Sequence, residues 1–312
     1  MIDLATFGET MGTVRFQDFP TAATNTRSSH AGAESNVAIG LARLGHQVSW
    51  IGSLGADTYG ELILRSLLAE NVDVGGVRRL TDRATGLLVS RPAGMGAFSV
   101  DYHRTESAGR QFSAEQIDYL FSLKPRIVHL TGITPALGEV ARQATVTVAE
   151  RAREAGIPVS FDVNFRSRLW AAREAQPVLA QIAGAASIVC GGPEELELLT
   201  GESDVSAGVE ALLAAGVQTV VTKDSGTATA YSANSTTTRA SHNVTVRDTI
   251  GAGDAFVAGF LSGVLDGADP GTCLERGHLC GAFAVGSIGD WEGAPTRAAL
   301  AAANIGSGEV LR

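Results

Sequence analysis

A regular alternation of short apolar strands with longer helical segments constrains this chain more than any other feature of its sequence. Strands joined by helices pair in parallel, and a parallel sheet is covered by helices on both faces. A chain of 312 residues, 45% of them hydrophobic, is long enough to bury such a sheet. The alternation predicts strands at 126–130, 159–162, 186–190 and 219–222, and helices at 139–155, 172–183, 194–200 and 205–215. We therefore expect an α/β protein with a mostly parallel sheet that binds ligands at the carboxyl edge of its strands.

Two segments near the start of the chain lie outside this alternation. Residues 11–31 lack helical periodicity, and residues 85–90 and 98–104 resemble a hairpin whose turn spans 91–96. No crossover helix separates these strands, so we expect them to form a small second sheet. A further antiparallel pair is predicted at 227–231 and 239–246, followed by helices at 255–265, 273–287 and 297–303. No linker or repeat divides the chain, so we expect one domain over residues 1–312.

Charge and cysteine content narrow the classes of partner. The formal net charge is -9, the pI is about 5.2, and no block of Lys and Arg is present, which argues against nucleic acid or an anionic membrane as a partner. Three cysteines at 190, 273 and 280 lack metal-ligand spacing and suit a reducing compartment. The start of the chain has no basic segment, and no apolar run approaches about 18 residues. We expect a soluble, cytoplasmic protein.

The segment DTIGAGD at residues 248–254 is the strongest candidate for chemistry. A Gly-Ala-Gly turn before an apolar helix points several backbone N–H groups at one place, and the helix dipole adds positive charge there. Asp254, on the first turn of that helix, could act as a general base toward a hydroxyl that approaches a bound phosphate. The same residues also suit a glycine-rich connector in which Asp254 caps the helix, and this segment alone does not separate the two.

Polar groups follow several of the predicted strands. Glu9 ends the first strand, at 2–7, and could bind substrate hydroxyls or simply belong to a turn. Asp162, Asn164 and Arg166 alternate after another strand, which predicts that they point the same way, with Arg166 placed to hold an anion. The alternative is that Asp162 caps a helix and Arg166 lies in a surface pair.

Four further groups are candidates for binding a substrate, a nucleotide or a metal ion. Asn36 opens a small-residue helix at 37–45, and Tyr102 with Arg104 suits a carboxylate or a polyol unless they form an exposed strand end. Residues 223–226, KDSG, form a turn that could bind the ribose and phosphates of a nucleotide. Glu195 is an acidic residue at the start of a predicted helix, where it stabilises the helix by itself; in a functional site it would face a hydrated Mg²⁺. No G-x-x-x-x-G-K-[ST] loop is present, and 251–253 is not G-x-G-x-x-G, which disfavours P-loop and nicotinamide-binding proteins.

Together these motifs resemble the ribokinase-like (PfkB) carbohydrate kinases over essentially the full length of the chain. The glycine-rich segment 32–45 resembles the first signature of that family, and DTIGAGD resembles the second, D-T-x-G-A-G-D. Within the family, the segments 33–38 (AESNVA), 102–108 and 289–296 (GDWEGAPT) are most similar to those of 2-keto-3-deoxygluconate kinases.

The resemblance implies a ribokinase-like three-layer α/β/α fold, with a small lid sheet from residues 11–31 and 84–104 that often doubles as a homodimer interface. It implies transfer of the γ-phosphoryl group of ATP, with Mg²⁺ and a monovalent cation such as K⁺, to a primary hydroxyl of a sugar acid. The implied catalytic residues are the base Asp254, the anion hole Gly251, Ala252 and Gly253, and Arg166, which would bridge the sugar and the γ-phosphate. The implied sugar-binding residues are Glu9, Gly32, Ala33, Asn36, Tyr102, Arg104, Asn164 and Asp290. The residues implied to lie along ATP are Lys223, Ser225, Gly226, Gly251 and Gly253, with Glu195 near the metal and Asp248 near the monovalent cation.

Three rival hypotheses remain open from the sequence. The nearest is a family kinase that acts on fructose, a nucleoside or another sugar acid. A non-catalytic sugar-binding protein on the same scaffold is the second, although retention of Asp254 and its glycines argues against it. A dehydrogenase is the third and the most distant.

Overall fold

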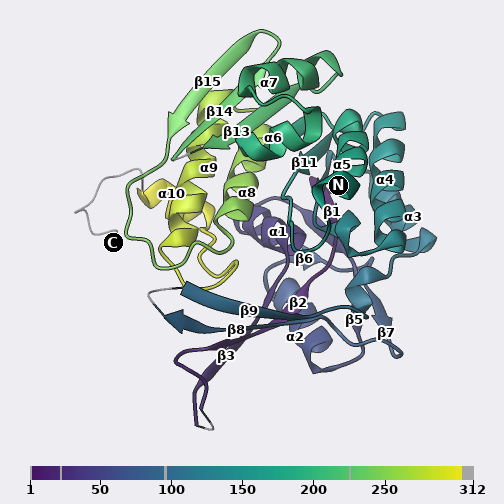
Figure 1. The fold of residues 1–312 in the computed structure, drawn as a ribbon, viewed down its shortest axis with the longest axis vertical. Helices are drawn as coiled ribbons and strands as arrows, with labels where there is room; N and C mark the ends of the chain where they lie inside the picture. The colour runs from purple at the N-terminus through teal and green to yellow at the C-terminus, as the bar shows by residue number, and fades with distance from the viewer. Residues whose placement is uncertain (1, 22, 95–96, 225, 304–312) are drawn as a thin grey trace.

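A nine-stranded sheet runs through the computed structural model, which describes residues 2–21, 23–94, 97–224 and 226–303 (Figure 1). Its strand order is β15-β14-β13-β12-β11-β10-β1-β4-β6. All neighbours pair in parallel except β13–β14 and β14–β15, which are antiparallel. The strands are β1 (Leu4–Phe7), β4 (Val48–Ile51), β6 (Val72–Asp73), β10 (Ile127–Thr131), β11 (Val159–Asp162), β12 (Ile188–Gly191), β13 (Thr219–Asp224), β14 (Thr227–Ser232) and β15 (Ser235–Ala240). The predicted parallel α/β sheet is confirmed.

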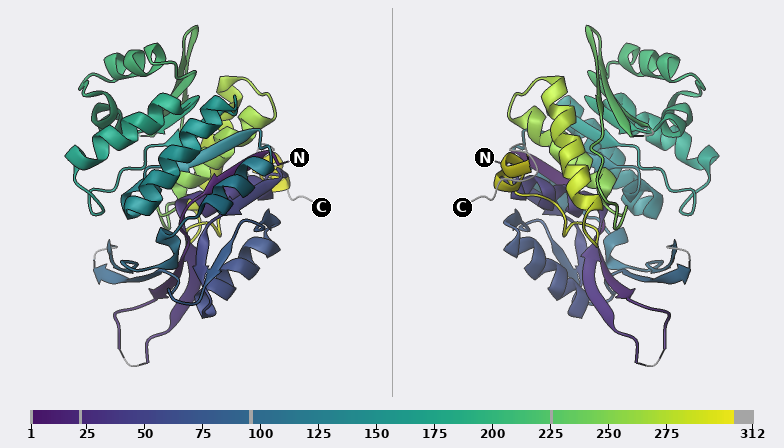
Figure 2. Two further views of the ribbon diagram at one scale, coloured as in Figure 1. Left: turned by 90° about the vertical axis from the view of Figure 1, so that its right-hand side faces the viewer. Right: turned by 90° about the vertical axis from the view of Figure 1, so that its left-hand side faces the viewer.

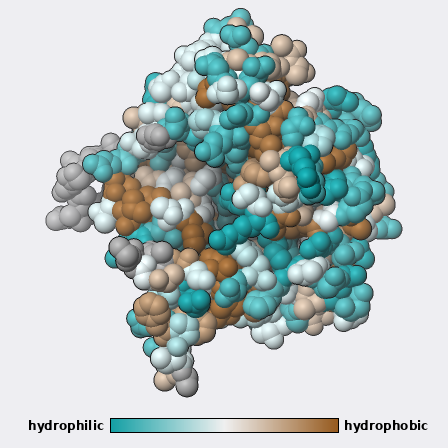
Figure 3. All heavy atoms as spheres, in the orientation of Figure 1, coloured by the Kyte–Doolittle hydropathy of each residue, from teal (hydrophilic) through white to brown (hydrophobic). Residues whose placement is uncertain are grey.

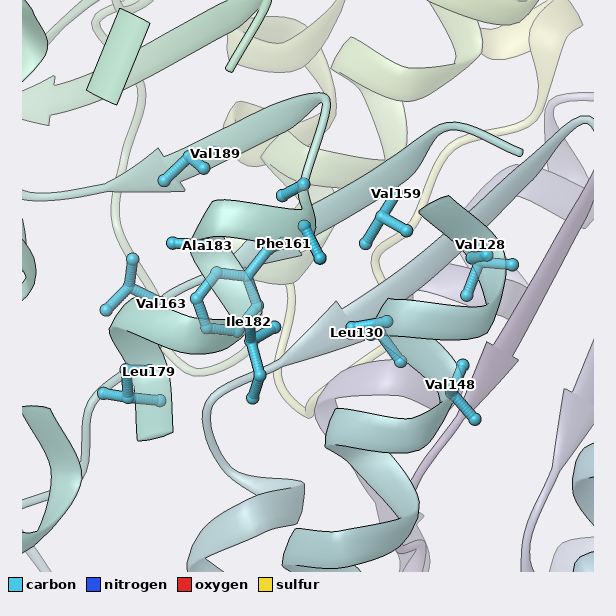
Figure 4. Packing of buried hydrophobic residues seen from close by; sticks show 14 of the residues in the cluster. Val128, Leu130, Val148, Val159, Phe161, Val163, Leu179, Ile182, Ala183 and Val189 are labelled. Carbon is cyan, nitrogen blue, oxygen red and sulfur yellow. The ribbon is translucent and has the colours of Figure 1, made fainter. Parts of the chain in front are cut away.

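Helices cover both faces of this sheet because its central strands are apolar on both sides. On β1, Leu4 belongs to one buried cluster and Phe7 to the other. Figure 4 shows the cluster that contains Phe7, where Val148 lies beside Leu130 and Ile182 beside Phe161. The helices of this face are α3 (Ala114–Ser122), α4 (Glu139–Glu154), α5 (Ala172–Ala185), α6 (Pro193–Thr200) and α7 (Val205–Ala214). The helices of the other cluster are α1 (Ala33–Arg43), α2 (Thr58–Ala69), α8 (Ala252–Leu265) and α9 (Pro270–Val285), and a short α10 (Arg297–Ala303) follows.

A separate four-stranded sheet, here called the small sheet, projects from the main body at one end (Figure 2). Its order is β3-β2-β8-β9, from strands β2 (Met11–Phe16), β3 (Thr26–Ala31), β8 (Leu87–Gly94) and β9 (Ala97–His103). The hairpins β2–β3 and β8–β9 are antiparallel, and β2 joins them by pairing in parallel with β8. A two-stranded sheet of β5 (Ser53–Gly55) and β7 (Arg78–Leu80) lies apart from it. The predicted small second sheet is confirmed.

Some predicted boundaries were wrong. The strand expected at 239–246 is β15 at Ser235–Ala240, because the exposed, Ser- and Thr-rich edge strand lacks an apolar signal. The hairpin turn expected at 91–96 begins later, since β8 continues to Gly94. Pro92 is tolerated there because the pairing of β8 with β2 ends at Ser90. Met95 and Gly96 lie outside the described residues.

Helix α3 is missing from the sequence prediction, although Ser113 and Gln116 form a capping box at its start. Within the described part of the chain, no helix is long and apolar enough to cross a membrane.

Candidate active site

A cavity of about 960 Å³ lies between the carboxyl edge of the large sheet and the small sheet. It collects groups that are far apart in the sequence, because the parallel strands end at one edge and the small sheet covers that edge. The predicted site residues that line it are Glu9, Gly32, Ala33, Asn36, Tyr102, Arg104, Asn164, Arg166, Glu195, Lys223, Gly251, Gly253, Asp254 and Asp290. Among the described residues, Ala252, Gly226 and Asp248 do not line it, and Ser225 lies outside the described residues.

The turn before α8 can be built only with glycine at position 251. Gly251 has φ +74, and a Cβ there would lie 1.8 Å from the carbonyl oxygen of Asp290. The helix begins at Ala252, and its first turn leaves backbone N–H groups without helical partners. Because Gly251 and Gly253 line the cavity, these N–H groups and the positive end of the dipole stand at its wall. The next residues of α8 are buried in the core, which fixes the turn in place.

Asp254 is the carboxyl group beside this turn. Asn36, from α1, donates a hydrogen bond from Nδ2 to Asp254 Oδ2 at 2.8 Å. Burial raises the pKa of Asp254 to about 7, against the opposing effect of the Asn36 hydrogen bond. The charge of Asp162 raises this pKa further, and that of Lys223 lowers it. A carboxyl with such a pKa can both accept and return a proton near neutral pH.

Asp162 at the end of β11, Lys223 near the end of β13 and Glu195 on the first turn of α6 form a charged group. Lys223 Nζ lies 3.3 Å from Asp162 Oδ1, and the Asp162 side chain is 5% exposed. The Glu195 carboxylate accepts hydrogen bonds from the backbone N–H groups of Phe165 and Gly192, each at 2.8 Å. It therefore helps to cap the N-terminus of α6 as well as lining the cavity. Burial raises the pKa of Glu195, and the charge of Asp162 adds to that effect.

Asp162, Asn164 and Arg166 all line the cavity, but they do not alternate along a strand as expected. The strand ends at Asp162, and Asn164 has φ +39, so the chain turns before Arg166. The alternative in which Asp162 caps a helix does not hold either, since the next helix begins at Ala172. Arg166 is exposed and donates to the carbonyl oxygen of Phe165 at 3.4 Å.

Arg104 is engaged by a carboxylate of the protein itself. Its guanidinium is ion-paired with Glu9, whose side chain is 2% exposed, and Ser107 Oγ donates to Glu9 Oε1 at 2.6 Å. Arg104 Nε is buried and has no hydrogen-bond partner among the described residues. The ring of Tyr102 lies 5.7 Å from the guanidinium carbon. The predicted group is therefore brought together, with Glu9 as its counter-ion.

Asp248 lies in the loop before the turn, and Asp290 lies in the loop after α9, where its backbone carbonyl is close to Gly251. Asp248 is ion-paired with Arg15 of the small sheet, and it accepts N–H groups from Ile250 at 3.2 Å and Gly289 at 3.3 Å. The guanidinium of Arg15 is thus paired with the Asp248 carboxylate, which was expected to face a monovalent cation. Burial raises the pKa of Asp290 to about 8, and the charges of Glu292 and Asp254 contribute. Asp162 was grouped with Asn164 and Arg166 in the sequence but was given no role in binding or catalysis. Arg15 was not among the predicted site residues, because nothing in its sequence surroundings marks it.

Comparison with known proteins identifies the class. The model of the pfkB family of carbohydrate kinases matches residues 1–297. The chain belongs to this family. A family member of this kind is a carbohydrate kinase, with the ribokinase-like fold described above.

Relatives of known name and structure agree with this assignment. The 2-dehydro-3-deoxygluconokinase of Bacillus subtilis is 36% identical over 307 residues, which cover 96% of this chain and 94% of that protein. A PfkB protein of Polaromonas sp. JS666 has a crystal structure with a TM-score of 0.87 and 33% identity, covering 97% of this chain and all of that one. A putative ribokinase II of E. coli, solved in complex with ATP and Mg²⁺, superposes with a TM-score of 0.89 at 23% identity, covering 97% and 98%.

Proposed function

We propose that the protein is an ATP-dependent kinase of 2-keto-3-deoxygluconate, also named 2-dehydro-3-deoxygluconate, that phosphorylates a primary hydroxyl of this sugar acid. The observation that carries the proposal is the position of Asp254, a carboxyl with a pKa of about 7 beside the N-terminus of α8 at the wall of the cavity. The similarity to the Bacillus subtilis enzyme supports the choice of substrate.

In the proposed reaction, Asp254 takes the proton of the sugar hydroxyl while the hydroxyl oxygen attacks the γ-phosphorus of ATP. The bond from that phosphorus to the β,γ-bridging oxygen breaks, and ADP leaves with the electron pair. Backbone N–H groups at Gly251, Ala252 and Gly253 would stabilise charge on the transferring group, and Arg166 would approach it from the exposed side of the cavity. The residues proposed to bind the sugar acid are Glu9, Gly32, Ala33, Asn36, Tyr102, Arg104, Asn164 and Asp290.

ATP and Mg²⁺ fit the charged end of the cavity. Mg²⁺ in kinases is held by one or two carboxylates together with phosphates and water, and it neutralises phosphate charge. Glu195 lines the cavity and keeps lone pairs beyond its two backbone bonds, so it is the proposed metal-side carboxylate. Lys223 and Gly226 are proposed to lie along ATP. Asp248 is less suited to bind K⁺ than Glu195 is to bind Mg²⁺. The Asp248 carboxylate already pairs with Arg15 and accepts hydrogen bonds from two backbone N–H groups.

The small sheet is proposed to act as the lid of a single kinase domain and as a homodimer interface. Its strands line the cavity through residues such as Met11, Arg15 and Tyr102, which supports the lid role. Figure 3 shows hydrophobic residues over β8 and β9, and Phe19 and Phe98 are 61% and 42% exposed. Sedimentation equilibrium of the protein and of Phe98→Asp would test the dimer. Use of ATP agrees with the cytoplasmic location that the sequence predicts.

An ADP-release screen over sugar acids, ketoses and nucleosides tests the proposed substrate. We expect the highest kcat/KM with 2-keto-3-deoxygluconate. The ion pair of Arg104 with Glu9 favours one alternative, because a neutralised guanidinium suits a neutral sugar such as fructose. A preference for fructose or a nucleoside would reassign the substrate. If no compound in the screen caused release of ADP, the proposed function would be contradicted.

A further inference from the structure

Lysine is almost absent from this chain. Of its 24 basic residues only two are lysines, Lys124 and Lys223. Lys124 is exposed, whereas Lys223 lies at the end of β13 and lines the cavity. A guanidinium is planar and broad, and an ammonium is a compact point charge. Lys223 therefore places a compact positive charge at the wall of the cavity.

Residues from two elements, β11 and α8, surround this ammonium. Asp162, at the end of β11, pairs with it at 3.3 Å. Phe256, on α8, presents its ring face with the centroid 5.9 Å from Nζ. A Cβ added at Gly253 would lie 4.0 Å from Nζ, so the charge stands directly against the turn that carries Asp254.

The surroundings of Asp254 are strongly acidic. Glu34 and Asn36 face it from α1, Asp162 from β11, and Asp290 from the loop after α9. Lys223 is the cation among the described groups that act on it. Glu195 also acts on Lys223, from the start of α6. Burial alone would lower the pKa of Lys223, but Asp162, Cys190 and Glu195 outweigh burial and raise it, so the ammonium stays charged across the working pH range.

We propose that Lys223, held in place by Asp162, is a positioning residue that sets the protonation state of Asp254. The inference rests on the proposed role of Asp254 as the base. Asp162 has two opposing effects: it fixes the cation near Asp254, and its own negative charge disfavours a second carboxylate there. Within the pair, Lys223 lowers the pKa of Asp254 and Asp162 raises it.

The titration of the Asp254 carboxyl tests this inference without an activity assay. In protein labelled with ¹³C at the aspartate carboxyl carbons, the Asp254 resonance is identified by its loss in Asp254→Asn. We expect its midpoint to move to higher pH by about one pH unit in Lys223→Met, because a cation is removed, and to lower pH in Asp162→Asn, because an anion is removed. The double variant loses both charges and is expected to return close to the wild-type midpoint.

Lys124→Met is the matched control, since it removes the other lysine from an exposed site and should leave the midpoint unchanged. The opposite directions of the two single variants separate a charge effect from general loosening of the site. An unchanged midpoint in Lys223→Met, or movement of both variants in one direction, would overturn the inference. If the midpoints move as expected while the pH profile of kcat/KM does not follow them, the inference stands and the assignment of Asp254 as the base fails.

Discussion

The side-chain amide of Asn36 donates a hydrogen bond to the carboxyl of Asp254 across 218 residues of sequence. The two signature segments of the family meet at this bond, one from the start of α1 and the other from the start of α8. Asn36 thereby orients the carboxyl through Asp254 Oδ2, and in the proposed reaction Asp254 Oδ1 would accept the proton of the substrate. The contact ties the proposed base on α8 to α1.

Replacement of Asp254 by Asn should abolish turnover with little effect on nucleotide binding. The amide keeps the size of the side chain and its contact with Asn36, but it cannot take a proton. We expect kcat to fall by about 10³-fold, within the range of general-base removal. Steady-state kinetics and calorimetric titration with ATP measure the two effects. Wild-type kcat in this variant would show that another group is the base.

The rate should depend on pH through Asp254. A base works when ionised, and burial raises the pKa of this carboxyl to about 7. The ionised fraction therefore rises about tenfold per pH unit below that value and levels off above it. We expect kcat/KM for the sugar to follow the same curve between pH 5.5 and 8. A flat profile over this range would rule out a base with this pKa.

Alanine at Gly251, just before α8, should damage the site far more than alanine at Gly267, just after α8, which provides a matched control. The two glycines have φ +74 and +73, so both substitutions carry a similar backbone strain of about 1 kcal/mol. A Cβ at Gly267 meets nothing within 4 Å, whereas at Gly251 it would strike the Asp290 carbonyl.

We therefore expect both alanine substitutions to lower the free energy of unfolding. Only Gly251→Ala should also lower kcat/KM, by about 100-fold, because the turn at residues 251–253 moves. Urea denaturation and kinetics measure the two effects. Equal activity of the two variants would argue against a catalytic turn at 251–253.

Loss of Arg104 should separate acidic from neutral substrates. A charge-assisted hydrogen bond to a carboxylate contributes about 1.5–3 kcal/mol, so Arg104→Ala should reduce kcat/KM for a sugar acid by roughly 10- to 100-fold. A neutral ketose should lose much less. Glu9→Gln is the companion variant, because it frees the guanidinium from its counter-ion and should improve the ratio in favour of the acid. Equal losses for acid and ketose would show that Arg104 does not recognise a carboxylate.

Much of the fold could be predicted because its signals are local. Apolar strands at β10 and β11 and the helices between them show their periodicity directly in the sequence, and Gly251 shows where α8 begins. The edge strand β15 was misplaced because its exposed Ser and Thr residues carry no core pattern. Local signals reveal elements where burial is strong.

The ion pairs of the site could not be predicted in the same way. Arg15 and Asp248 come from the small sheet and from the loop before α8, and no spacing rule connects them. Glu9 was expected to face substrate, but it also neutralises Arg104, because the end of β1 and the end of β9 meet. Such partners depend on how distant elements are placed, which only the assembled fold determines.

The packing of α1 on α8 has a consequence for the newly made chain. Gly40 lies so close to Ala258 that a Cβ there would come within 2.7 Å of the alanine Cβ. During translation α1 leaves the ribosome long before α8 is synthesised, so the apolar face of α1 stays unpacked until α8 has been made. A chain cut short before α8 lacks Asp254, the proposed base. Under the proposed mechanism, phosphorylation therefore requires synthesis to have passed α8.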